Sequence, residues 1–112
     1  MRIVLVASLH ALAGRAEEVA AAVERLRRAS ATTPGCEGFQ AGRGVEDPAE
    51  FVVVSTWRDE AAMRAHFAGA AYALYAEDVT PALARPSDVV AHYVDRTVHP
   101  VGDASSDPAR QG

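Results

Sequence analysis

The chain has 112 residues, a net charge of −4, 49% hydrophobic residues and 23% charged residues. This length suits one domain with a single core, and the composition excludes wholesale disorder. The mild acidity, with no basic run longer than Arg27-Arg28, argues against nucleic acid or an anionic membrane surface as a partner.

Cys36 is the only cysteine, so the chain can form neither an internal disulfide nor a cysteine-rich metal site. No two of the four histidines stand at a chelating spacing, so we expect no metal site. The apolar run at the N-terminus is too short for a signal peptide or a membrane span. These features predict a cytoplasmic protein with no membrane partner.

The first two elements are a buried strand and an amphipathic helix. Residues 3–9 are apolar except at Ser8, which predicts a strand covered on both faces. Alternation places four of these residues on one face: Ile3, Leu5, Ala7 and Leu9. Acidic residues open a helix after Gly14, and Thr33-Pro34-Gly35 ends it.

A hairpin follows this helix. Its first strand, residues 37–45, contains three glycines, which indicate a bulge or a close backbone approach. Residues 46–49 form a turn. Residues 51–57 are apolar at nearly every position and rich in β-branched residues, which predicts another strand covered on both faces.

The remaining elements are a broken helix and a last strand. Asp59 can cap a helix that breaks near Gly69 and resumes toward Leu83. Residues 88–96 supply the fourth strand. We expect a domain over residues 1–97 and a loose tail over residues 98–112, which has almost nothing to bury.

The resulting order, β-α-β-β-α-β, predicts an α+β, ferredoxin-like fold with a split βαβ pattern and an antiparallel four-stranded sheet. Two helices cover only one face of such a sheet, yet two strands are apolar on both faces. A second copy of the sheet is the simplest cover for the other face. We therefore expect a two-fold homodimer with its sheets packed face to face.

Several residues at specific spacings resemble the antibiotic biosynthesis monooxygenase (ABM) domain family over roughly residues 3–93. They are Pro34-Gly35-Cys36, Asp47-Pro48, Phe51, Trp57, Asp59-Glu60, Ala61 and His66. The resemblance implies the dimeric α/β-barrel fold. Family members include cofactor-free oxygenases of polyketide anthrones and quinols, haem-degrading enzymes, an isomerase of a small signalling molecule and many uncharacterised proteins.

The chain departs from the family at the residues that define its known reactions. Haem-degrading members use an Asn, a Trp and a His at the positions of Ala7, His66 and Ala76, so haem degradation is not expected. Anthrone oxygenases pair a strand Asn with a Trp and use a helix Tyr, at the positions of Val53, Trp57 and Met63. Only the tryptophan is retained.

The resemblance places a pocket between the sheet and its own helices. Its expected lining is Ala7, Leu9, Phe39, Val53, Ser55, Met63, Phe67, Tyr72 and Tyr75 around His66. Mostly apolar walls suit a small hydrophobic or aromatic substrate. The resemblance implies a cofactor-independent monooxygenase. We expect His66 to be the catalytic base, because an ordinary imidazole pKa of ~6.5 suits proton abstraction near neutral pH. Trp57 would then orient the ring by stacking, and the substrate anion would pass an electron to O₂.

Other interpretations stay open. Trp57 can be a core residue, and His66 a packed, hydrogen-bonded histidine that joins helix to sheet. The same pocket and base would also serve a non-oxidative cyclase or isomerase. Loss of the family's Asn and Tyr favours a third alternative, a non-catalytic dimeric module that binds a hydrophobic metabolite.

Overall fold

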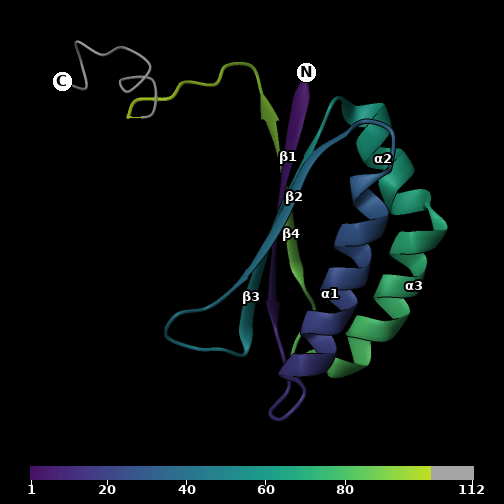
Figure 1. The fold of residues 1–112 in the computed structure, drawn as a ribbon, viewed down its shortest axis with the longest axis vertical. Helices are drawn as coiled ribbons and strands as arrows, with labels where there is room; N and C mark the ends of the chain where they lie inside the picture. Colours follow the sequence, from purple (N-terminus) through teal and green to yellow (C-terminus); the bar gives the residue numbers. More distant parts are fainter. Residues whose placement is uncertain (102–112) are drawn as a thin grey trace.

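The computed structural model describes residues 1–101 and confirms the predicted α+β architecture. The elements are β1 (Arg2–His10), α1 (Ala16–Ala31), β2 (Cys36–Arg43), β3 (Glu50–Trp57), α2 (Glu60–Ala68), α3 (Ala70–Val79), the 3-10 helix η1 (Thr80–Ala82) and β4 (Asp88–Val94). The strands form one antiparallel sheet in the order β2-β3-β1-β4. The helices all lie on one face of this sheet (Figure 1).

The second helical region is split where the sequence predicts a break. The Asp59 carboxylate accepts a hydrogen bond of 2.9 Å from the Ala62 N–H and so caps the start of α2. Gly69 ends α2 with an extended backbone (φ −81°, ψ 161°), and α3 begins at the next residue. The break lets α3 run beside α1 over the sheet (Figure 1).

The strand register builds the core from alternate residues. On β1 and β3 the pairs that face the helices are Ile3 with Trp57, Leu5 with Ser55, Ala7 with Val53, and Leu9 with Phe51. Two buried clusters result, one around Leu9 and Val19 and one around Ile3 and Trp57. The glycine-rich β2 has the predicted irregularity, a register shift between Cys36 and Gly38.

The opposite face of the sheet has an apolar centre that is uncovered within the described residues. We call it the open face and define it by five valines on β1, β3 and β4: Val4, Val6, Val52, Val54 and Val90. Val52 is 47% exposed, Val54 37% and Val90 41%. The two central strands carry apolar residues on both faces, but of the cover predicted for both faces the described residues provide only the helix side.

The end of the chain falls largely outside the described residues. Of the expected tail over residues 98–112, only residues 98–101 are described, and they are exposed and form neither helix nor strand. Among residues 1–101, no helix combines the length and the apolar character that crossing a bilayer requires.

The turn before β2 provides a test of the fold. Gly35 has φ +85°, and a Cβ on it would lie 2.5 Å from the Ala62 Cβ at the start of α2. Gly14 has φ +78°, but a Cβ there would meet nothing within 4 Å. Gly14→Ala therefore incurs only backbone strain of about 1–2 kcal/mol, whereas Gly35→Ala also displaces α2.

We expect Gly35→Ala to lower the free energy of unfolding by at least about 1 kcal/mol more than Gly14→Ala does. Urea denaturation of both variants measures this difference. Equal losses of unfolding free energy in the two variants would mean that α2 does not pack tightly on the turn.

Candidate active site

His66 lies on the inward face of α2 and packs against the end of β3. The residue is 8% exposed. Its ring stacks on the Trp57 indole with ring centroids 4.4 Å apart and an interplanar angle of 28°. No side-chain hydrogen bond of His66 is found among residues 1–101, and its ring nitrogens are not sealed from solvent. A buried imidazole with a free nitrogen can accept or donate a proton.

Trp57 is completely buried. Its indole Nε1–H donates a 3.0 Å hydrogen bond to the Ser55 hydroxyl oxygen, two residues earlier on the same face of β3. Trp57 therefore belongs to the core and supports two polar side chains, Ser55 by a hydrogen bond and His66 by stacking.

A row of aromatic rings continues from His66 along α3. Phe67, the next residue on α2, is tilted against the imidazole with the ring centroids 5.2 Å apart, and Tyr72 on α3 meets the imidazole in an edge-type arrangement at 5.3 Å. Tyr75 follows Tyr72 at 5.6 Å. Tyr72 and Tyr75 form a wall between His66 and the larger space beside α3, because both line the recess that holds His66 and the cavity beyond it.

Two adjoining cavities lie along this wall. The inner recess has a volume of about 30 Å³ and is lined by Leu5, Ala7, Leu26, Phe39, Val53, Ser55, His66, Tyr72, Tyr75, Ser87 and Val89. The outer cavity has a volume of about 450 Å³ and is lined by Tyr72, Tyr75, Ala76, Val79, Thr80, Leu83, Ala84, Arg85, Pro86 and Ser87. They adjoin because Tyr72, Tyr75 and Ser87 line both.

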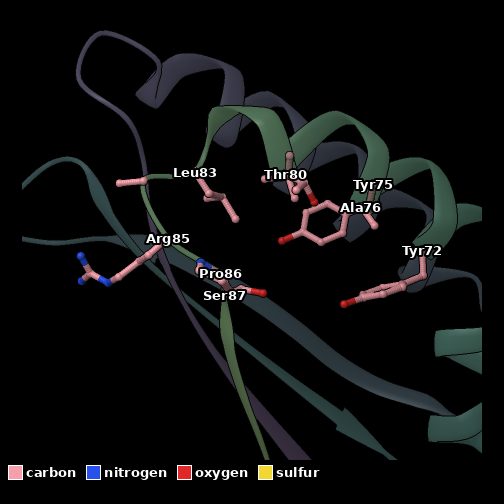
Figure 2. Close-up of a pocket in the computed structure, with 10 residues that line it drawn as sticks. Tyr72, Tyr75, Ala76, Thr80, Leu83, Arg85, Pro86 and Ser87 are labelled. Carbon is pink, nitrogen blue, oxygen red and sulfur yellow. The ribbon is translucent and has the colours of Figure 1, made fainter.

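Figure 2 shows how the side chains of the outer cavity are directed. The hydroxyls of Tyr72 and Tyr75 point the same way, toward the segment that carries Pro86 and Ser87. The Arg85 side chain points away from both tyrosines. The polar groups that face this cavity are therefore mainly neutral hydroxyls.

The structure brings most of the predicted site residues together. Those that line the inner recess are Ala7, Phe39, Val53, Ser55, His66, Tyr72 and Tyr75. The others, Trp57, Leu9, Met63 and Phe67, line neither of the two cavities. Trp57, Leu9 and Met63 are buried in the core clusters, and Phe67 packs against one of them.

No sequence pattern indicates that the segment after α3 lines the outer cavity. The sequence pattern predicts only that a helix ends near Leu83, yet Thr80 of η1 and all of residues 83–87 line the outer cavity. The only sequence feature that points to Ser87 is its place in the chain, directly before the strand that pairs with β1.

Burial keeps the side chains of the site neutral. It lowers the pKa of His66, so the imidazole is uncharged at neutral pH. Burial also raises the pKa of Tyr72, and burial together with the nearby Tyr72 raises the pKa of Tyr75 to about 12. The inner recess therefore offers hydrogen-bonding groups without a formal charge.

A separate group of possible metal ligands lies away from both cavities. Ligand atoms of His10, Asp47 and Glu50 lie within 4.8 Å of one another at the end of the hairpin and β1. Both carboxylate side chains are about half-exposed. This group was not anticipated from the histidine spacing, because its members come from three segments.

The fold and the cavity define a class of small ferredoxin-like α+β proteins with a pocket between sheet and helices. The antibiotic biosynthesis monooxygenase family model matches residues 2–78, and the chain belongs to that family. None of the curated proteins compared with the sequence matches it significantly.

Solved structures share the fold at low sequence identity. A candidate antibiotic biosynthesis monooxygenase from Nitrosomonas europaea is 19% identical, with a TM-score of 0.81 over 88% of this chain and 94% of that one. Rv0793 from Mycobacterium tuberculosis is 16% identical, with a TM-score of 0.82 over 88% of this chain and 100% of that one. A candidate antibiotic biosynthesis monooxygenase from Deinococcus radiodurans is 15% identical, with a TM-score of 0.81 over 87% of this chain and 96% of that one.

The lowered pKa of His66 predicts a dependence of stability on pH. In the unfolded chain the imidazole has an ordinary pKa of ~6.5, so below that pH the unfolded state binds more protons than the folded state. The contribution of the neutral His66 to the free energy of unfolding is therefore fully present above about pH 6.5. Below it, stability falls by up to about 1.4 kcal/mol per pH unit until the folded-state pKa is reached.

Urea denaturation at pH 7.5 and pH 5.0 measures this effect. Wild type should lose more stability on acidification than His66→Gln, whereas the control His99→Gln, at an exposed position, should behave as wild type. Identical losses for wild type and His66→Gln would contradict the prediction.

Proposed function

We propose that the protein is a monooxygenase that needs no added cofactor and acts on a small hydrophobic aromatic substrate of the quinol or anthrone type. The observation that carries this proposal is His66, a buried neutral imidazole with no side-chain hydrogen bond among residues 1–101, in a recess that adjoins a larger cavity. Membership of the ABM family supports a monooxygenase-like activity.

The sizes of the two cavities suggest how such a substrate would lie. The outer cavity, at about 450 Å³, falls within the range of small-molecule sites. The recess, at about 30 Å³, has room for only one or two water-sized groups. The ring would therefore occupy the outer cavity between the tyrosines and Ser87, with one hydroxyl extending into the recess toward His66.

The proposed reaction requires no external reductant. His66 takes the proton of the substrate's hydroxyl or enol, and the resulting carbanion-like anion transfers an electron to O₂. The two radicals combine to a peroxide, which takes up the proton. In an anthrone, loss of water then converts the CH₂ of the substrate to C=O. One oxygen atom enters the product, the other leaves as water, and the substrate supplies all four electrons.

One observation favours an alternative without oxygen chemistry. Tyr72 and Tyr75 stand between His66 and most of the outer cavity. A ligand that remained in the outer cavity would not meet the imidazole. A module that binds a hydrophobic metabolite, or a cyclase or isomerase using His66 as a base, is therefore the second proposal.

Oxygen uptake with a panel of anthrones and hydroquinones tests the first proposal. His66→Ala should lower turnover on the order of a hundredfold, because it removes the general base. His99→Ala makes the same chemical change at an exposed position and should retain wild-type turnover. Binding without uptake above the buffer rate in wild type would favour the second proposal.

We further propose that the protein is a homodimer in the cytoplasm, with the open faces of two sheets packed together. The exposed valines of this face need a cover, and an identical apolar surface related by two-fold symmetry supplies one. The ABM resemblance implies the same assembly, and the lone Cys36 suits a reducing compartment.

Light scattering after size-exclusion chromatography tests the assembly. Wild type should have the mass of two chains. Val54→Lys places a charge at the centre of the open face and should yield monomers, because a buried unpaired ammonium is strongly unfavourable. Leu74→Lys, at a residue 56% exposed on α3, should leave the dimer intact. A monomeric wild type would contradict the proposal.

A further inference from the structure

Ser55 has a hydrogen-bond donor that finds no partner in the part of the chain that the structure describes. Its side chain is 4% exposed and lines the inner recess. The hydroxyl oxygen accepts the Trp57 indole N–H at 3.0 Å. No acceptor for the hydroxyl hydrogen is found among residues 1–101. Because the indole occupies one side of the oxygen, the hydrogen remains free for a group in the recess.

The same indole also fixes the second polar group of the recess. Trp57 stacks on His66 at a centroid distance of 4.4 Å. Ser55 and His66 are thus both held by one completely buried side chain, and both line the recess. Most of the remaining lining is apolar, and the other polar side chains of the recess are Tyr72, Tyr75 and Ser87, which it shares with the outer cavity.

We infer that Ser55 and His66 form a donor–acceptor pair that selects a hydroxyl group, with Trp57 as the positioning residue for both. The inference rests on the proposed function in one respect, that the polar end of an aromatic ligand enters the recess. The ligand hydroxyl donates to the bare nitrogen of His66 and accepts from Ser55.

The chemistry of the pair excludes other common groups. A ketone or a methyl ether cannot donate to the imidazole nitrogen. A carboxylate or an ammonium would lose its hydration in a recess without a charged partner, which is strongly unfavourable. A hydroxyl both donates and accepts, and one or two water-sized groups fill the space.

Binding of three matched probes under argon tests the inference without any oxygen chemistry. The probes are 2-naphthol, 2-methoxynaphthalene and naphthalene, measured by equilibrium dialysis against the full chain. Wild type should prefer the naphthol on the order of tenfold over the other two. Ser55→Ala should remove most of this preference, and Ser55→Thr, which keeps a hydroxyl, should retain it.

A double-mutant cycle tests the positioning by Trp57. Trp57→Phe keeps an aromatic ring but lacks the N–H, so it should reduce the naphthol preference several-fold in wild type and not in the Ser55→Ala background. If Trp57→Phe weakened the binding of all three probes equally in both backgrounds, the role of Trp57 would be packing alone, and the inference would be overturned.

Two further outcomes would also overturn the inference. One is an undiminished naphthol preference in Ser55→Ala, and the other is no binding of the naphthol to wild type at millimolar concentration. Failure of the monooxygenase proposal is distinguishable, because it would appear as absent oxygen uptake while the naphthol preference persisted.

Discussion

The stacking of His66 on Trp57 joins α2 to the end of β3, and the position of the candidate site depends on it. Trp57 is completely buried and the two rings lie 4.4 Å apart, so the last turn of α2 is fixed on the sheet. Gly69 then ends α2 and allows α3 to take its own direction beside α1. As a result, the tyrosines of α3 lie next to His66 and form the wall between the two cavities.

The same strands serve both the site and the open face. On β3, Val53 and Ser55 point into the recess, while the alternating Val52 and Val54 lie on the open face. A register slip of one residue would exchange the two sets and destroy both surfaces at once. The residues of the proposed interface and those of the proposed pocket alternate along the same two central strands. A change of register in either strand would therefore alter both surfaces, although no side chain belongs to both.

The sequence predicted features that depend on local patterns. Apolar runs located β1 and β3, Asp59 located the start of α2, and Gly69 located the helix break. It did not reveal that Trp57 lies behind the recess rather than in it, or that Ser87 lines both cavities. Those facts depend on how β4, η1 and α3 pack across a sheet, which no spacing along the chain encodes.

The neutrality of the site limits the chemistry that His66 can perform. An ordinary phenol has a pKa of ~10, at least about 3.5 units above that of an imidazole whose pKa burial has lowered. Complete proton transfer would then cost at least about 5 kcal/mol. A hydrogen bond from Ser55 to the new oxyanion would offset about 1.5–3 kcal/mol. The part of the cost that is not offset favours substrates whose hydroxyl or enol is more acidic than a phenol. It also favours a mechanism in which proton transfer is completed only as the electron moves to O₂.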